Sequence, residues 1–224
     1  MSSSAVIAEL AAHLVGLLEE AAASEQQHRI VVAVAGTPGS GKTHVSRLVS
    51  QAVNAQLGRD ACAVVPMDGF HLTRAQLQLL PDPIEALRRR GAPWTFDAEA
   101  FVAAVRQLRH GAHTALPGFD HAAGDPVAGA VAVGPAQRIV LVEGLYAHVA
   151  ELPWALVGTQ LADELWWMQP ADAAAAHDRL VLRHVASGLA ADRQAAEARI
   201  SGNDAPNAAY VMQSRLPATR VIMN

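Results

Sequence analysis

Residues 36–43 read GTPGSGKT, and this octapeptide decides the fold of the chain. It is a complete GxxxxGK[ST] motif, it follows directly on the apolar run IVVAVAG of residues 30–36, and it precedes a helical segment at residues 43–56. A second apolar run at residues 61–67 completes a strand–helix–strand unit. Such a unit is typical of a parallel sheet, so we expect an α/β fold built around a phosphate-binding loop (P-loop).

The P-loop predicts a nucleotide site. Its glycines let successive backbone N–H groups turn toward one anion, and the following helix adds the partial positive charge of its N-terminus. In such loops the lysine reaches the terminal phosphates and the final hydroxyl ligates Mg²⁺, so we expect ATP and Mg²⁺ as cofactors. Lys42 is the only lysine of the chain, which argues against a role in surface solubility. The candidate nucleotide-binding residues are Gly36, Thr37, Pro38, Gly39, Ser40, Gly41, Lys42 and Thr43, and Thr43 is also a candidate metal ligand.

The remaining elements alternate along the chain. Apolar spacing predicts an amphipathic N-terminal helix within residues 1–24 that packs on the core. Aspartates at positions 82 and 97 predict helix starts, and residues 111–134 predict a loop or a small hairpin. Further strands are expected at residues 138–144, 163–168 and 219–223, and helices at residues 171–189 and 192–200. The sequence therefore predicts one doubly wound domain over residues 1–224, with a mainly parallel sheet, helices on both faces and a small helical lid at about residues 178–191.

Composition restricts the partners. Hydrophobic residues make up 51% and charged residues 17% of the chain, which excludes general disorder. The net charge of −4 argues against a nucleic-acid or anionic membrane surface, so a small molecule is the expected partner. The single cysteine, Cys62, lies in an apolar run and reads as a small core residue, and no secretory signal or membrane span is evident. We expect a cytoplasmic protein, and a homodimer stays open.

Two absences restrict the class of P-loop protein. GTPases that read guanine through an NKxD motif need a second lysine, which this chain lacks. ATP-driven machines usually end an acidic strand with Asp-Glu, whereas Val142-Glu143-Gly144 offers one acid followed by glycine. Both observations favour a transferase over a switch or a motor.

Two acidic residues follow predicted strands. Asp68 stands in MDGFH after residues 61–67, so its carboxylate should emerge at the same sheet edge as the P-loop, where ligands bind. There it can accept the proton of an attacking hydroxyl group, or it can simply form an Asp-Gly turn. Glu143 can hold Mg²⁺ directly or through water, or cap a loop.

Arginines supply the remaining candidates. Arg179 and Arg183 lie four residues apart on one helix face, where they can clamp the transferring phosphoryl group from a lid, although exposed helix arginines are common. By contrast, the cluster at residues 88–90 ends a helix, and we expect it to be a solvated face that offsets the helix dipole.

The ordered set of motifs resembles one family. GTPGSGKT, MDGFH, GAPWTFD (91–97), LPGFDHAAGDP (116–126), IVLVEGLY (139–146), RLVLRH (179–184) and GNDAPNA (202–208) together resemble the P-loop kinases grouped with uridine kinase, phosphoribulokinase and bacterial pantothenate kinase. The chain looks most similar to the bacterial branch described as nucleoside/nucleotide kinase-like or fructose transport system kinase-like. The resemblance covers residues 29–207.

The resemblance implies a site and an activity. Asp68 would be the catalytic base, Glu143 the second acid near Mg²⁺, and Arg179 and Arg183 lid residues that act with Lys42. Candidates for the acceptor pocket are His71, Trp94, Phe96, Asp97, Phe119, His121 and Tyr146, of which Trp94 and Phe96 could equally be core aromatics. The implied reaction is ATP-dependent phosphorylation of a hydroxyl on a nucleoside, a sugar or a pantothenate-like polyol. The alternative is an ATP-binding regulatory or assembly protein without a dedicated acceptor.

Overall fold

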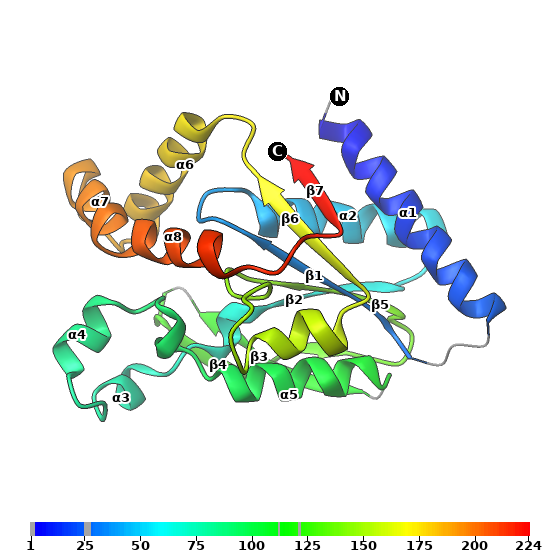
Figure 1. Ribbon diagram of the computed structural model, residues 1–224, viewed down its shortest axis with the longest axis horizontal. Helices are drawn as coiled ribbons and strands as arrows, with labels where there is room; N and C mark the ends of the chain where they lie inside the picture. Colours follow the sequence, from blue (N-terminus) through cyan, green and yellow to red (C-terminus); the bar gives the residue numbers. More distant parts are fainter. Residues whose placement is uncertain (1–2, 25–27, 112, 121) are drawn as a thin grey trace.

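A five-stranded parallel sheet forms the centre of the residues that the computed structural model describes, which are residues 3–24, 28–111, 113–120 and 122–224 (Figure 1). The strand order is β2-β5-β1-β6-β7. The strands are β1 (Ile30–Gly36), β2 (Cys62–Pro66), β5 (Ile139–Glu143), β6 (Glu164–Gln169) and β7 (Arg220–Met223). The predicted α/β fold with a parallel sheet is therefore confirmed.

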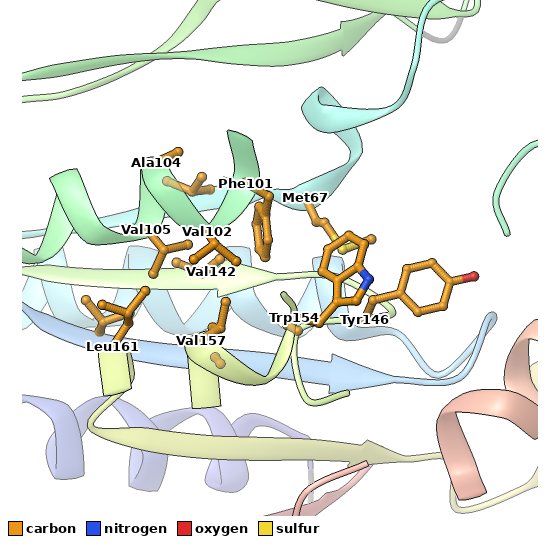
Figure 2. Close-up of a cluster of buried hydrophobic side chains, with 14 of the residues drawn as sticks. Met67, Phe101, Val102, Ala104, Val105, Val142, Tyr146, Trp154, Val157 and Leu161 are labelled. Carbon is orange, nitrogen blue, oxygen red and sulfur yellow. The ribbon is translucent and has the colours of Figure 1, made fainter. Parts of the chain in front are cut away.

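Helices cover both faces of the sheet because the side chains of β1 alternate. Ile30, Val32 and Val34 pack against α1 (Ser3–Ala23) and α2 (Lys42–Leu57). The intervening residues Val31, Ala33 and Ala35 face a second core with α5 (Ala98–Arg109) and the turn η3 (Val157–Leu161). Figure 2 shows part of this second core, in which Phe101 and Val105 of α5 lie above Val142 of β5. The sheet is thus doubly wound, as the sequence predicts.

The segments between the strands carry the site. After β2 come η1 (Met67–Phe70), α3 (Arg74–Leu77), α4 (Pro83–Arg88) and η2 (Pro93–Thr95). Asp82 caps α4 by accepting from the backbone N–H of Glu85, and Asp97 caps α5 by accepting from that of Ala100, so both predicted helix starts are confirmed. Residues 111–134 contain an antiparallel hairpin of β3 (Thr114–Asp120) and β4 (Asp125–Val133).

A helical arm follows β6. It consists of α6 (Ala173–Ala186), α7 (Arg193–Arg199), η4 (Ile200–Asp204) and α8 (Ala205–Ser214), the last of which the sequence analysis does not predict. The arm has a small core of its own, made of Leu180, Val181, Ala190, Ala196 and Ile200. Ion pairs such as His177–Glu197 at 2.6 Å and Arg193–Asp178 at 2.7 Å join α6 to α7. Residues 178–191 therefore belong to a unit that could move as one piece, and their role as a lid stays a prediction.

Among the helices of the described residues, none has both the length and the apolar character that crossing a bilayer requires.

His148 lies fully buried just after β5, and its ring links that segment to β1. Its Nε2 lies 2.9 Å from the carbonyl oxygen of Ala33, so the ring must carry its proton on Nε2 to donate there. Burial lowers the pKa of His148 from 6.5 to about 4, against the opposing effect of the Ala33 hydrogen bond and with a further lowering by Arg215. The neutral ring is the form that the fold requires.

We therefore expect folding to become less favourable as the pH falls from 6.5 to 4. The unfolded chain takes up a proton at His148 in this range and the folded chain does not, which corresponds to about 3 kcal/mol for a shift of this size. His148→Gln keeps a neutral side chain, so urea unfolding of wild type should lose about that much more stability than the variant between these pH values. If the free energy of unfolding changed equally with pH in the two proteins, His148 would not be the group responsible.

Candidate active site

The P-loop closes tightly at the carboxyl edge of the sheet, between the end of β1 and the start of α2. A Cβ atom at Gly36 would lie 2.6 Å from the Ser40 hydroxyl and 2.8 Å from the Cβ of Met168 in β6. No side chain fits there, which is why the motif begins with glycine at this position. The backbone N–H of Ser40 donates to the carbonyl of Thr37 at 3.1 Å and tightens the turn. The predicted strand–loop–helix arrangement is present.

Glu143 stands at the centre of this edge. It ends β5, which lies between β1 and β2, and it pairs in register with Val34 on one side and Pro66 on the other. Its side chain is only 4% exposed, and one carboxylate oxygen accepts a hydrogen bond from the Thr43 hydroxyl at 2.9 Å. Burial raises the pKa of Glu143, the charge of Lys42 lowers it, and the charge of Asp68 raises it again. Lys42, Thr43, Asp68 and Glu143 therefore share one electrostatic environment.

Asp68 follows β2 in the turn η1 and is half-buried. Its backbone carbonyl accepts hydrogen bonds from the backbone N–H of His71 at 3.2 Å and from the His71 ring at 2.9 Å. Within the described part of the chain, no group donates a hydrogen bond to the Asp68 carboxylate. The backbone therefore forms the turn, and the side-chain carboxylate takes no part in it.

Three aromatic rings stack next to this turn. The His71 ring lies 3.9 Å from the Phe96 ring and 4.9 Å from the Phe119 ring, measured between centroids. The Arg90 guanidinium lies over Phe119 at 5.5 Å. The structure thus brings together His71, Phe96 and Phe119, three of the residues that the sequence analysis assigns to the acceptor pocket.

The predicted acceptor residues differ in how much of their surface a ligand could reach. Phe96 is 7% exposed and belongs to the core, which is the second of the two readings that the sequence leaves open for it. Tyr146 is fully buried, its hydroxyl donates to the carbonyl of Gly91 at 2.6 Å, and burial raises its pKa. Asp97 caps α5, Trp94 is 49% exposed, and His121 lies outside the described residues. Trp94 is thus the aromatic of this set with the most surface available to a ligand.

The arginines at residues 88–90 correct a prediction. Only Arg88 lies on a solvated face, where it pairs with Glu85. The Arg90 side chain turns inward to Asp125 at 2.8 Å, and that of Arg89 turns toward η4 and α8. The expectation of a purely solvated cluster is wrong because Arg89 and Arg90 find partners that are remote in sequence.

The partners of Arg89 form a buried polar network that the sequence analysis misses. The Arg89 guanidinium donates to the amide oxygens of Asn203 and Asn207, each at 3.1 Å. The amide nitrogens of the two asparagines donate in turn to the carbonyls of Arg90 at 2.9 Å and Gly91 at 3.1 Å. This network fastens the helical arm to the segment between α4 and η2. The available signal was the pair of asparagines four residues apart in GNDAPNA.

The two predicted lid arginines lie on the exposed face of α6. The Arg179 guanidinium donates to the carbonyl of Gly39 in the P-loop at 3.2 Å. Arg183 is one helical turn further along and is solvent-exposed. The predicted proximity of α6 to the phosphate site is therefore present for Arg179.

Comparison with known proteins identifies the family. No family model matches the chain. An ATP-dependent kinase-like protein of Aspergillus versicolor is 44% identical over 161 residues, which cover 70% of this chain and 92% of that protein. A candidate uridine kinase of Schizosaccharomyces pombe is 36% identical over 189 residues, or 84% and 80% of the two chains. The chain belongs to the uridine kinase-like P-loop kinases.

A solved structure agrees with this family. A candidate fructose transport system kinase from Silicibacter sp. TM1040 superposes with a TM-score of 0.80 at 38% identity, covering 95% of this chain and 98% of that one. The family resemblance seen in the sequence is thereby confirmed.

The Arg89 network predicts a stability effect. Asn207→Ala removes one buried acceptor of the Arg89 guanidinium and one buried donor to the Gly91 carbonyl. We therefore expect the free energy of unfolding to fall by about 1–3 kcal/mol. Gln213→Ala, an exposed change on the same helix, is the matched control and should have little effect. Equal chemical denaturation midpoints for the two variants would show that the network contributes no stability.

Proposed function

We propose that this kinase transfers the γ-phosphate of ATP to a hydroxyl group of a small metabolite. The observation that carries the proposal is the convergence of Lys42, Thr43, Glu143 and Asp68 at one edge of the sheet. A switch or a motor needs no carboxylate for an acceptor hydroxyl, whereas a small-molecule kinase does. The half-buried Asp68 is well suited to that role.

The chain's own groups account for the phosphate side of the reaction. Lys42 and the backbone N–H groups of the P-loop bind the phosphate chain and offset its charge. The Thr43 hydroxyl and the Glu143 carboxylate are oxygen donors of the kind Mg²⁺ prefers, and Mg²⁺ usually binds through one or two carboxylates together with substrate phosphates. When bound, Mg²⁺ would neutralise charge on the β- and γ-phosphates. The donors present therefore fit the ion.

The acceptor side rests on Asp68 and the rings beside it. The Asp68 carboxylate would take the proton of the attacking hydroxyl as the bond to phosphorus forms. His71 and Phe119 offer ring surfaces on which the acceptor could be oriented, and the half-exposed Trp94 stays a further candidate on the strength of its exposure. The proposed acceptors remain a nucleoside, a sugar and a pantothenate-like polyol.

Arg179 and Arg183 would complete the site from the helical arm. Guanidinium groups suit the charge of a phosphoryl group in transfer, and closure of the arm would exclude water that competes with the acceptor. The hydrogen bond from Arg179 to Gly39 supports this proposal, since it puts one of the two arginines on the P-loop already.

We further propose that the reaction takes place in the cytoplasm. A free cysteine such as Cys62 fits a reducing compartment.

Cys62 also fits the core role expected from the sequence. Its side chain is buried, and burial raises the pKa of its thiol to about 12. This thiol therefore offers no nucleophile for the reaction.

The experiment that tests the function measures ADP release from ATP over a panel of nucleosides, sugars and polyols. A kinase gives ADP in an acceptor-dependent way. Lys42→Ala is the control and should abolish turnover without unfolding, because it removes the lysine positioned for the β- and γ-phosphates. ATP binding without acceptor-dependent turnover over the whole panel would instead indicate a regulatory or assembly protein.

Asp68→Asn separates binding from chemistry. We expect ATP affinity to stay within a few-fold of wild type and acceptor-dependent transfer to fall by roughly 10² to 10⁴. Isothermal titration with ATP and steady-state kinetics measure the two effects. An unchanged rate would reduce Asp68 to a turn residue, and a loss of ATP affinity that added Mg²⁺ restores would make it a metal ligand.

The lid makes a separate prediction. If the arm closes, amide hydrogen exchange across residues 178–191 should slow markedly when a bisubstrate analogue binds, because closure orders that segment. Helix α5 lies on the core and serves as the internal reference. Equal exchange in residues 178–191 with and without the analogue would count against a lid.

A further inference from the structure

Asn224 makes an unexpected contact with the P-loop. It follows β7 directly, and its side-chain amide nitrogen donates to the carbonyl oxygen of Ser40 at 2.8 Å. The two residues are 184 positions apart, so nothing in the P-loop motif itself indicates this contact. Asn224 is not among the residues that the motif or the family resemblance assigns to the site.

The backbone of Asn224 is fixed independently of this contact. Its N–H donates to the carbonyl of Gln169 at 2.9 Å, and its carbonyl accepts from the N–H of Ala171 at 2.7 Å. Since Gln169 ends β6, these two bonds hold the backbone of Asn224 at the end of the paired strands β6 and β7. The side-chain amide of Asn224 therefore donates to the P-loop from a backbone that other hydrogen bonds hold in place.

The contact determines the orientation of one peptide group. In a trans peptide the C=O and N–H groups point in opposite directions, so a donor that holds the Ser40 carbonyl also directs the N–H of Gly41 the other way. Gly41 has a φ of 87°, a left-handed conformation that favours glycine. The place that a Cβ at Gly41 would occupy is taken by the Asn224 amide. Gly41 and Asn224 thus fit each other.

We propose that Asn224 is a positioning residue that holds the Ser40–Gly41 peptide in the orientation that binds the phosphate chain. The proposal deepens the proposed function, since it rests on binding of the ATP phosphates by residues 36–43. Asn224 acts through the loop backbone, so its contribution must be independent of the base and the sugar of the nucleotide. It acts together with Arg179, which holds the neighbouring carbonyl of Gly39 at 3.2 Å.

The experiment measures the binding of two ligands, ATP and inorganic tripolyphosphate, by separate isothermal titrations. Both titrations are made in the presence of Mg²⁺. Asn224→Ala removes the donor, and we expect both ligands to bind about 3- to 10-fold more weakly, which is the usual range for one hydrogen bond. Asn224→Asp keeps the size of the side chain but replaces the donor with a negative charge near the Ser40 carbonyl and the phosphate site. The affinity for both ligands should therefore fall further than in Asn224→Ala. Met223→Ala, which changes a 56% exposed side chain of the same strand, is the matched control and should bind both normally.

The outcomes separate the possible roles of Asn224. Weaker binding of ATP with unchanged binding of tripolyphosphate would mean that Asn224 contacts the nucleoside. That result would overturn the proposal. Unchanged binding of both ligands, or equal losses in Met223→Ala, would overturn it too. Thermal unfolding of each variant gives the structural control, and the isosteric aspartate variant provides the test if alanine destabilises β7. Binding is measured without an acceptor, so failure to find a phosphorylated product would refute the proposed function and leave this result standing.

Discussion

The hydrogen bond from Thr43 to Glu143 is the interaction on which the site depends. It joins the first turn of α2 to the end of β5, the strand between β2 and β1, and the carboxylate that accepts it is almost fully buried. A buried carboxylate is costly unless polar partners and an opposite charge accompany it, and here Thr43 and Lys42 supply both. The same two residues are the ones proposed to bind the phosphates and the metal ion. A costly buried group thus stands where the proposed chemistry needs it, and Asp68, which follows the neighbouring strand β2, acts on its charge.

Local signals explain what the sequence could predict. The P-loop, the strand before it and the helix after it are encoded within about thirty consecutive residues, and the aspartates at positions 82 and 97 each cap a helix that begins at the next residue. Asp68 and Glu143 could be assigned to the same edge because the carboxyl ends of parallel strands meet there. These parts of the site follow from spacing and residue type alone.

Long-range contacts explain what the sequence could not predict. Arg89 stands at the C-terminal end of a helix, where a solvated cation is common. Its hydrogen-bond partners nevertheless lie 114 and 118 residues further along the chain. Phe96 and Phe119 look alike in sequence and both contact His71, but Phe96 is also buried against Trp154 while Phe119 is only half-buried. Which aromatic ring enters the core depends on how the hairpin and the segment between α4 and α5 pack, and no local pattern reports that.

The single lysine of this chain has a practical consequence. Lys42 opens α2 inside the P-loop and is the one side-chain primary amine in the sequence. Reagents that acylate amines, from fluorescent esters to bifunctional cross-linkers, therefore have one side-chain target, and that target is the residue proposed to bind the phosphates. Given the role proposed for Lys42, coupling chemistry that is harmless on a lysine-rich enzyme would inactivate this one, and protection from such reagents would report occupancy of the nucleotide site.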